Sequence, residues 1–458
     1  MSALWTAREI ARATGGAVHG DFAATGVTFD SREVAPGDLF IALKGEATDG
    51  HRFLDQAYAA GASGAVVSAD ETRPHVRVAD GMAALEALGT AARQRTEARI
   101  AGVTGSVGKT GTKEALRLAL ERGAPGCVHA SVKSYNNHTG VPLSLARMPA
   151  ESLYGVFEMG MNHAGELAGL TRLVRPHVAI VTAIAPAHRA YFDSDEAIAD
   201  AKGEIFQGLE PGGTAIIPFD SPHRDRLIAA AKPYAANIVT FGRTAGADVR
   251  AKDAAAAQGG GSLVVATLPG AVNLTFTIGM AGSHWVSNGL AVIAAVQALN
   301  GDLAAAGLAL AGLTGLTGRG ERREVMLPGG SATLIDESYN ANPVSMAAAL
   351  SVLGVTAGRR IAVLGGMREL GSESDAFHAG LAAPIAAAGV AHALLVGDEM
   401  MPLAQALAGK IAFDHVADAG EALQALRDML APGDVILIKG SNAIGLGRLV
   451  TALTGGDG

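Results

Sequence analysis

The residue types that most directly indicate chemistry form a glycine-rich turn at residues 104–110, with the sequence TGSVGKT. An apolar, strand-like stretch at 99–103 precedes this turn, and a helical pattern at 110–121 follows it. Such a turn presents backbone N–H groups and the positive end of a helix to one point, which suits a triphosphate. Lys109 could neutralise the β- and γ-phosphates of ATP, and the Thr110 hydroxyl could ligate Mg²⁺. Position 103 is Val where the full phosphate-loop pattern has glycine, so the sequence predicts a shortened loop.

A second lysine lies on the apolar face of a predicted helix at residues 193–209, for which Asp193 is the expected N-cap and Glu196 completes a capping box. At 100° per residue, the apolar face of this helix consists of Ile198, Ile205, Phe206 and Leu209. Lys202 falls in the middle of that face, where a bare ammonium would be costly or would lose its proton. Two explanations are open. Either the long stem carries the ammonium to water, or the neutral amine reacts with CO₂ to give a carbamate that can hold a metal.

Two further candidate metal ligands lie near the carboxyl ends of predicted strands at 155–159 and 177–184. Glu158 lies near the end of the first strand, and His188 lies just beyond the end of the second. In an open parallel sheet these ends border the ligand crevice. Taken singly, Glu158 reads as a helix-capping carboxylate and His188 as part of a solvated loop. Together with Thr110 and Lys202 they offer oxygen and nitrogen ligands for two Mg²⁺ ions.

The elements that would position these residues are predicted to form three α/β domains. The length alone predicts two or three domains, because 458 residues exceed the usual limit of about 250–300 for one core. Residues 1–97 mix short helices and strands and predict a small N-terminal α/β domain. Residues 98–312 predict a central phosphate-loop-type domain with a mostly parallel sheet, a β-hairpin at 263–278 and a closing helix at 286–299. Residues 313–458 alternate strand and helix regularly, which predicts a C-terminal Rossmann-like domain.

Composition excludes other classes of function. Hydrophobic residues make up 49% of the chain and charged residues 17%, which argues against disorder. The net charge is −8 and Lys/Arg residues do not cluster, so we expect no nucleic-acid partner. The uncharged run at 379–397 is interrupted by Pro384, Gly389 and His392, which indicates a helix, turn and strand rather than a membrane span. With a single cysteine, Cys127, and no secretion-signal pattern, we expect a cytoplasmic protein.

The shortened phosphate loop resembles that of the Mur ligases and of the folylpolyglutamate synthetases. Further phrases are similar to Mur ligase motifs, in chain order: NNHTGVPL at 136–143, EMGMN at 158–162, AH at 187–188, AKGEI at 201–205, GSHWVSN at 282–288, GR at 318–319 and DESYNANP at 336–343. DSR at 30–32 and DGHRF at 49–53 resemble the part of these enzymes that receives a UDP-sugar. Because these matches cover nearly the whole chain, it is identified as a member of the Mur ligase family.

The resemblance implies roles for individual residues, and it favours the carbamate on Lys202, since the family has a modified lysine in the phrase at 201–205. The implied catalytic residues are Lys109, Glu158, His188, Lys202 and Arg319. The implied ligands of two Mg²⁺ ions are Thr110, Glu158, His188 and Lys202. The implied ATP-binding residues are Gly105, Ser106, Val107, Gly108, Lys109, Thr110, Gly111, Asn288, Arg319 and Asp336. The implied substrate-binding residues are Ser31, Arg32, Asp49, His51, Asn136, Asn137, Tyr339, Asn340 and Asn342. Without the ordered series, Asn342 before Pro343 would read as a helix N-cap, and Arg319 as a solvated arginine.

Within the family, the phrases are similar to those of ligases that add D-alanyl-D-alanine to UDP-N-acetylmuramoyl-tripeptide during peptidoglycan precursor synthesis. The resemblance implies an acyl-phosphate intermediate, enclosed when the C-terminal domain closes about the glycines at 315–320. We expect a monomer whose partners are small-molecule substrates, namely ATP, the UDP-linked tripeptide and D-alanyl-D-alanine. The sequence departs from the family pattern at Ala183, Gly365–Gly366 and Asn442. The resemblance therefore leaves open which residues form the dipeptide pocket. A ligase that adds a single amino acid, and a nucleotide-binding homologue without catalysis, remain alternatives.

Overall fold

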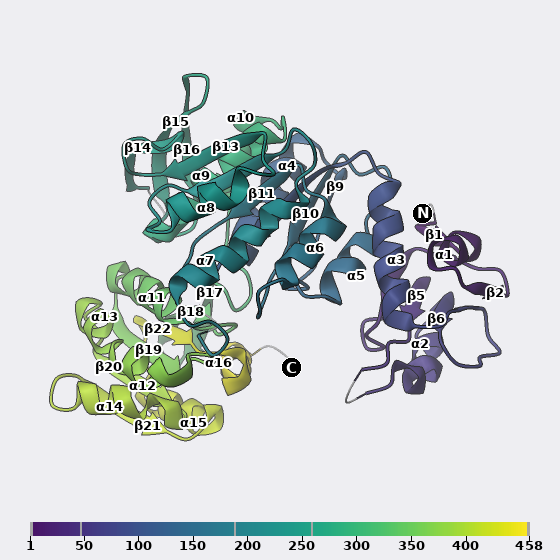
Figure 1. The fold of residues 1–458 in the computed structure, drawn as a ribbon. Helices are drawn as coiled ribbons and strands as arrows, with labels where there is room; N and C mark the ends of the chain where they lie inside the picture. Colours follow the sequence, from purple (N-terminus) through teal and green to yellow (C-terminus); the bar gives the residue numbers. More distant parts are fainter. Residues whose placement is uncertain (1–2, 46–47, 187–188, 258–259, 456–458) are drawn as a thin grey trace.

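The structure is a computed structural model that describes residues 3–45, 48–186, 189–257 and 260–455 of the chain. It contains three lobes, each built on its own sheet of five, nine or six strands (Figure 1). In Figure 1 the N-terminal lobe is purple, the central lobe runs from blue to teal, and the C-terminal lobe runs from green to yellow. The three-part α/β fold predicted from the sequence is therefore confirmed. The boundaries after residues 97 and 312 remain predictions.

The N-terminal lobe is a five-stranded sheet in the order β2-β7-β6-β5-β4, in which only β2 pairs antiparallel. Its first helix begins as its sequence dictates, because the Thr6 hydroxyl accepts from the Glu9 N–H and the Glu9 carboxylate accepts from the Thr6 N–H. The elements of this lobe are β1 (Trp5–Thr6), α1 (Ala7–Thr14), β2 (Ala17–His19), β3 (Ala23–Ala24), β4 (Gly26–Thr28), β5 (Asp38–Ile41), the 3₁₀ turn η1 (Gly50–Phe53), α2 (Leu54–Ala59), β6 (Gly64–Val67), β7 (His75–Arg77) and α3 (Gly81–Gln94).

The central lobe has a nine-stranded sheet in the order β16-β15-β14-β13-β12-β11-β8-β10-β9. Strands β8 to β14 run parallel, and β15 and β16 add an antiparallel hairpin as predicted. Helices α4, α9 and α10 bury one face of this sheet, and α5 to α8 bury the other. The elements are β8 (Arg99–Thr104), α4 (Lys109–Gly123), β9 (Val128–Ala130), α5 (Gly140–Ala146), β10 (Tyr154–Glu158), α6 (Glu166–Val174), β11 (Val178–Val181), α7 (Asp195–Gly203), η2 (Glu204–Gly208), β12 (Thr214–Pro218), α8 (Arg224–Ala231), β13 (Asn237–Gly242), β14 (Val249–Ala256), β15 (Ser262–Leu268), β16 (Val272–Ile278), α9 (Ser283–Ala298) and α10 (Leu303–Ala311).

The C-terminal lobe has a six-stranded sheet in the order β17-β18-β22-β19-β20-β21, parallel except for the edge strand β17. Helices α11, α13 and α14 cover one face, and α15 and α16 cover the other. The elements are β17 (Glu321–Leu327), β18 (Gly330–Glu337), α11 (Pro343–Val355), β19 (Arg359–Gly365), η3 (Gly371–Glu373), α12 (Ser374–Ala379), α13 (Ala382–Ala387), β20 (His392–Val396), η4 (Asp398–Met400), α14 (Met401–Leu407), β21 (Ala412–Val416), α15 (Ala419–Met429), β22 (Asp434–Lys439), η5 (Asn442–Ile444) and α16 (Leu446–Thr454).

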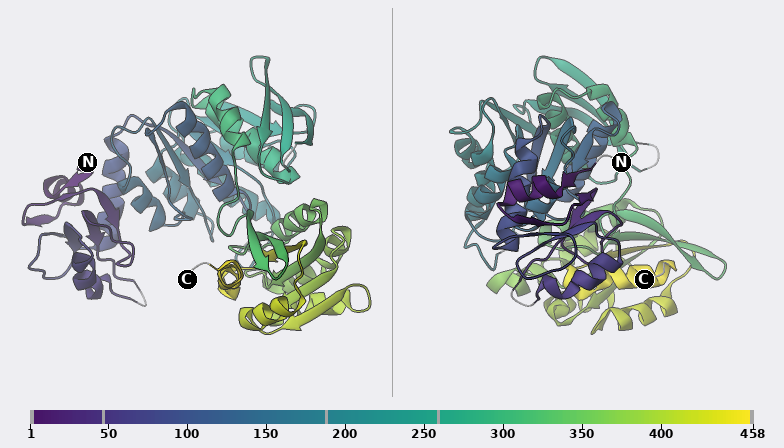
Figure 2. Two further views of the ribbon diagram at one scale, coloured as in Figure 1. Left: turned by 180° about the vertical axis from the view of Figure 1, so that it is seen from behind. Right: turned by 90° about the vertical axis from the view of Figure 1, so that its right-hand side faces the viewer.

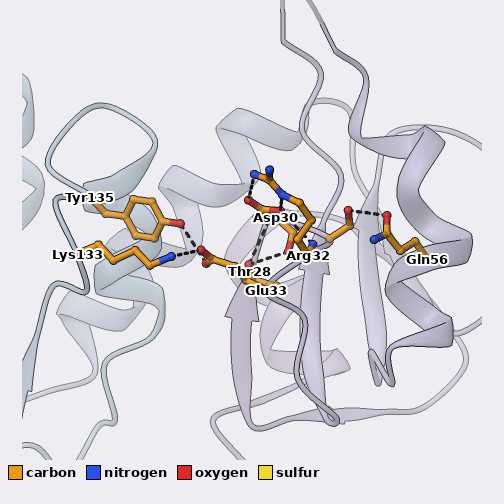
Figure 3. Close-up of polar contacts among 8 residues, drawn as sticks. Thr28, Asp30, Arg32, Glu33, Gln56, Lys133 and Tyr135 are labelled. Atoms are coloured by element: carbon orange, nitrogen blue, oxygen red, sulfur yellow. Dashed lines mark hydrogen bonds and ion pairs between the residues drawn. The ribbon is translucent and has the colours of Figure 1, made fainter. Parts of the chain in front are cut away.

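The N-terminal and C-terminal lobes each contact the central lobe and lie at different sides of it (Figure 2). On the N-terminal side, α3 packs against α5, and the buried Trp5 indole donates to the Ala146 carbonyl at 2.8 Å. A polar contact crosses the same junction, where the Glu33 carboxylate accepts from Lys133 and from the Tyr135 hydroxyl (Figure 3).

On the C-terminal side, two hydrogen bonds join the lobes. Arg319 donates to the Ser134 hydroxyl at 3.3 Å, and the Ala190 N–H donates to the Glu369 carbonyl at 3.1 Å.

The helix that carries Lys202 differs from the sequence prediction. Its N-cap is Ser194, not Asp193, because the extended Ser194 directs its hydroxyl to the Ala197 N–H. Position N3 is therefore Ala197, and the predicted capping box with Glu196 does not form. The α-helix ends at Gly203, and the 3₁₀ turn η2 follows it directly.

The uncharged run at 379–397 forms the end of α12, then α13 and β20, as predicted. Among the helices of the described residues, none is both long and apolar enough to cross a membrane.

Candidate active site

The phosphate loop lies where β8, a strand that pairs in parallel with β10 and β11 on its two sides, passes into α4. Gly105 has φ 150°, and a Cβ there would lie 1.9 Å from the Thr182 hydroxyl. Gly108 has φ 85° and directly precedes α4. The neighbouring strand end supports the loop, since the Thr182 hydroxyl donates to the Val107 carbonyl at 2.6 Å and the Ala183 carbonyl accepts from Ser106 N–H at 2.7 Å. Ala183, a departure from the family pattern, thus acts here through a backbone carbonyl that any residue supplies.

The loop has donors that are suited to phosphate. The Ser106 hydroxyl is buried and has no hydrogen-bond partner among the described residues, and Thr110 is 6% exposed at the first turn of α4. The Lys109 ammonium folds back to the Gly105 carbonyl at 2.7 Å. Burial lowers the pKa of Lys109; the Glu158 carboxylate acts to raise it, and the Arg319 charge acts to lower it. These electrostatic effects mean that Lys109, Glu158 and Arg319 lie close together.

Glu158 is the last residue of β10, opposite Val103 of β8, and is 1% exposed. Its Oε1 accepts from the Asn136 side-chain amide at 2.7 Å. Its Oε2 is buried and, within the described part of the chain, accepts no hydrogen bond. A buried carboxylate oxygen is costly without a partner. The arrangement therefore suits a cation at Oε2.

Lys202 lies in the interior of the central lobe, with none of its surface exposed. Its Nζ has no hydrogen-bond partner in the described ranges, so the explanation in which the ammonium reaches water is wrong. Burial lowers the pKa of Lys202 well below 10.5, and the charge of Lys109 lowers it further. Both effects disfavour the charged ammonium form of this lysine.

His188 lies outside the described residues, so the structure does not place this predicted ligand. Among the described residues, no three His, Cys, Asp or Glu side chains gather as a metal site. Of the four predicted magnesium ligands, Glu158 and Thr110 lie at the ends of adjacent elements, and Lys202 is electrostatically coupled to Lys109.

The nucleoside side of the loop is formed by α9 and the C-terminal lobe. A Cβ on Gly108 would lie 3.0 Å from the Asn288 amide, and a Cβ on Gly111 would lie 2.9 Å from the Trp285 ring. A cavity of about 320 Å³ continues from there between the two lobes; its lining includes Met280, His284, Trp285, Gly315, Arg322 and Glu337. The phrases at 282–288 and 336–343 include Trp285, Asn288 and Glu337, whereas no motif phrase includes Met280.

Arg319 follows Gly318 in a turn that is held by Asp336, a buried residue near the end of β18. The Asp336 carboxylate is 1% exposed and accepts from Gly318 N–H at 2.9 Å and from the Ser338 hydroxyl at 2.7 Å. This turn presents the Arg319 guanidinium, which lies 4.3 Å from the Tyr339 ring centroid. Asp336 thereby holds the turn that carries Arg319 in position.

The remaining residues of the C-terminal phrase have structural partners. Asn342 is the N-cap of α11 and forms a capping box with Ser345. The Asn340 carbonyl accepts from Lys439 at 2.8 Å, and Tyr339 is 39% exposed.

The predicted UDP-sugar residues lie in the N-terminal lobe. The Asp30 carboxylate accepts two hydrogen bonds from Arg32, and the Ser31 hydroxyl donates to Gln56 at 3.0 Å (Figure 3). His51 accepts from the Ser68 N–H through Nε2 at 2.9 Å, so its Nδ1 carries the proton and donates to Asp49 at 2.6 Å.

Asn137, expected beside Asn136 in substrate binding, accepts from the Gly140 N–H at 2.9 Å and shapes the start of α5. The structure therefore brings Asn136 to Glu158 but turns Asn137 to the backbone.

These features define a multi-lobed α/β nucleotide-binding protein with a shortened phosphate loop, a buried carboxylate on the adjacent strand and a fully buried lysine. Three family models match the chain: the Mur ligase family catalytic domain at residues 23–106, the Mur ligase middle domain at 103–296, and the Mur ligase glutamate ligase domain at 318–442. The UDP-N-acetylmuramoyl-tripeptide–D-alanyl-D-alanine ligase of Escherichia coli (strain K12) is 35% identical, over 94% of each chain. The ligase of the same name from Bacillus subtilis (strain 168) is 34% identical, over 93% of each chain. The chain belongs to the Mur ligase family.

Solved structures agree with this assignment. A crystal structure of MurF from Acinetobacter baumannii has a TM-score of 0.84 at 31% identity, covering 98% of this chain and 99% of that one. The MurF ligase from Thermotoga maritima in complex with ADP has a TM-score of 0.76 at 26% identity, covering 94% and 97%.

Proposed function

We propose that this protein is an ATP-dependent ligase that joins D-alanyl-D-alanine to UDP-N-acetylmuramoyl-tripeptide, a step of peptidoglycan precursor synthesis. Three relatives of that name are 34% or 35% identical over 93% or 94% of this chain. The observation that supports the proposal is the phosphate loop after β8 beside the buried Glu158, which ends the adjacent parallel strand β10. Lys202 is buried in α7, and the charge of Lys109 acts on it.

The reaction needs an activated acid, because joining a carboxylate to an amine in water is uphill. The terminal carboxylate of the tripeptide attacks the γ-phosphorus of ATP, which forms an acyl phosphate and releases ADP. The D-alanyl-D-alanine amine then attacks the acyl carbon, and phosphate leaves with one oxygen of the original carboxylate. Lys109 and Arg319 would stabilise the charge on the transferring phosphoryl group.

ATP would be held by the backbone of residues 105–111, with Asn288 on the nucleoside side and Arg319 and Asp336 from the C-terminal lobe. Magnesium fits the unpartnered Glu158 Oε2 and the Thr110 hydroxyl, since both are oxygen ligands. With Lys202 and His188 as further ligands, we propose two ions, whose charge would offset that of the phosphates.

Lys202 would complete this set as a carbamate. The neutral Nζ attacks CO₂, one N–C bond forms, and one proton leaves to solvent. The product carries a negative charge where the unmodified amine carries none. The supporting observations are the burial of the lysine and its unpartnered Nζ.

The three domains would divide the substrates between them. Residues 1–97 would bind the UDP-sugar through Ser31, Arg32, Asp49 and His51, with Asn136 and Asn137 from the central domain. Residues 98–312 would bind ATP. Residues 313–458 would close over ATP and bind the dipeptide through Tyr339, Asn340 and Asn342. We further propose that the protein acts as a monomer in the cytoplasm, where both nucleotide substrates are available.

The test is a reaction of the purified protein with ATP, Mg²⁺ and UDP-N-acetylmuramoyl-tripeptide, resolved by mass. With D-alanyl-D-alanine, we expect one product per ADP formed. Product formation only when the sugar dipeptide and a single free amino acid are supplied would favour the single-residue ligase. The absence of any acceptor-dependent ADP formation would favour a non-catalytic nucleotide-binding homologue.

A further inference from the structure

Lys113 is a fully buried lysine on α4, one helical turn after Lys109. Its ammonium donates to the Ser131 carbonyl at 2.7 Å, the Lys133 carbonyl at 3.3 Å and the Glu114 carboxylate at 2.5 Å. An ammonium has three donors, so all three are used. Burying such a charge is costly and is tolerated only with complete pairing. With all three donors used, the Lys113 ammonium holds the backbone at Ser131 and Lys133 in place.

The segment that Lys113 holds, residues 131–136, is also the segment that orients Glu158. The Ser131 hydroxyl accepts from the Glu158 N–H at 3.0 Å, and the Asn136 amide donates to Glu158 Oε1 at 2.7 Å. Gly160 N–H donates to the Asn136 carbonyl at 2.8 Å. Both ends of the segment are thus fastened to the end of β10.

The middle of the segment needs support. Lys133 has φ 52°, in the left-handed region that costs energy for a residue other than glycine. The hydrogen bond from Lys113 to the carbonyl of this residue fixes the strained backbone. On the outer side, Lys133 and Tyr135 contact Glu33 of the N-terminal lobe (Figure 3), and Ser134 accepts from Arg319 of the C-terminal lobe. One short segment therefore meets all three lobes.

We propose that Lys113 is a positioning residue for metal binding. It fixes residues 131–136 against the phosphate-loop helix, so that Ser131 and Asn136 hold Glu158 with Oε2 left for a divalent cation. This inference rests on the proposed role of Glu158 as a magnesium ligand. It links the helix that carries Lys109 and Thr110 to the carboxylate on the next strand, which keeps the two halves of the metal site in register.

Arg93 is the matched control that separates a positioning role of Lys113 from a purely structural one. Arg93 is 6% exposed and donates to the Val174 carbonyl and the Arg175 carbonyl, each at 2.9 Å. It is likewise a buried cation on a helix that satisfies two backbone carbonyls. In the described part of the chain it makes no hydrogen bond or ion pair with residues 131–136 or Glu158. R93M should therefore destabilise the fold without changing metal binding.

The experiment measures Mn²⁺ binding to the full chain by electron paramagnetic resonance in the presence of saturating ADP, together with the melting temperature. We expect K113M to weaken the Mn²⁺ site that E158Q weakens, by about tenfold, whereas R93M keeps wild-type affinity. S131A removes only the hydrogen bond to the Glu158 N–H and should weaken the same site by a smaller factor. S131A also decides the matter if K113M does not fold.

Wild-type Mn²⁺ affinity in folded K113M or in S131A would overturn the positioning role, as would an equal loss in R93M. If E158Q itself kept full Mn²⁺ affinity, the proposed role of Glu158 would be wrong, which is a different failure. Hydrogen exchange gives an independent readout, because the amides of residues 131–136 should exchange faster in K113M than in R93M.

Discussion

At the scale of single residues, the structure explains three lysines that serve different purposes in one neighbourhood. Lys109 follows the loop glycines, Lys113 is paired with three oxygens, and Lys202 is buried with an unpartnered Nζ. The sequence predicted the place of Lys202 from helical periodicity. The same periodicity places Lys113 on the buried face of α4 with Leu116 and Leu120.

Substitution of Lys202 tests its chemistry. We expect K202A to lose activity by on the order of 10²-fold, because the carbamate charge is lost beside the transferring phosphoryl group. Small carboxylic acids should restore part of the rate, since they can place a carboxylate in the space that is freed. Steady-state ADP formation with and without acetate measures this. Absence of rescue by any small acid would contradict a carbamate role.

The lowered pKa of Lys202 also predicts how stability depends on pH. Between its lowered pKa and 10.5, the unfolded chain binds a proton that the native lysine does not. The free energy of unfolding of unmodified protein should therefore rise with pH in this window, by up to about 1.4 kcal/mol per pH unit from this group. Denaturant unfolding in CO₂-free buffers should show this contribution to the slope, and K202M should lack it. Identical slopes would indicate that Lys202 is charged in the native state.

At the scale of elements, the sequence predicted strands that are buried on both faces and missed two edge strands of the C-terminal lobe, β17 and β21. β8, β10 and β11 are continuous apolar runs, and each was found. β17 has the sequence ERREVML at an antiparallel edge and β21 is a half-exposed edge, so neither shows an apolar pattern. α10 was missed because its alanine-rich sequence has no distinct apolar face.

The helix α7 provides a test at this scale. Ser194 caps α7, whereas the neighbouring Asp193 was the residue expected from the sequence. We expect S194A to lower the free energy of unfolding by about 1 kcal/mol, since an N–H at the helix start loses its acceptor. D193A is the matched control and should change it by less than about 0.5 kcal/mol. Chemical denaturation of both variants measures this, and a larger loss in D193A would reverse the assignment of the cap.

At the scale of the whole molecule, the candidate site draws on all three lobes. The residue motifs predicted which segments would take part, because backbone turns and buried charges leave a local signature. The contact of Glu33 with Lys133 and Tyr135 could not be predicted, because it joins residues 100 and 102 positions apart through exposed or partly buried side chains. Such contacts depend on how lobes pack, which no local pattern records.

The chain between the central and C-terminal lobes is compact at its glycines. A Cβ on Gly315 would lie 2.1 Å from the Gly320 backbone, and Gly318 and Gly320 have φ of 74° and 82°. If this linker is the hinge, the C-terminal lobe should move when substrates bind. We expect the radius of gyration from small-angle X-ray scattering to fall on addition of a non-hydrolysable ATP analogue and UDP-N-acetylmuramoyl-tripeptide. An unchanged value at saturation would mean that the lobes do not close.

The central claim is that this site transfers the γ-phosphoryl group of ATP to a substrate carboxylate. The most direct measurement uses UDP-N-acetylmuramoyl-tripeptide with ¹⁸O in its terminal carboxylate and follows the label by mass spectrometry of the released phosphate. An acyl phosphate predicts one ¹⁸O in each phosphate formed with product. Phosphate free of ¹⁸O, alongside product formation, would contradict the mechanism.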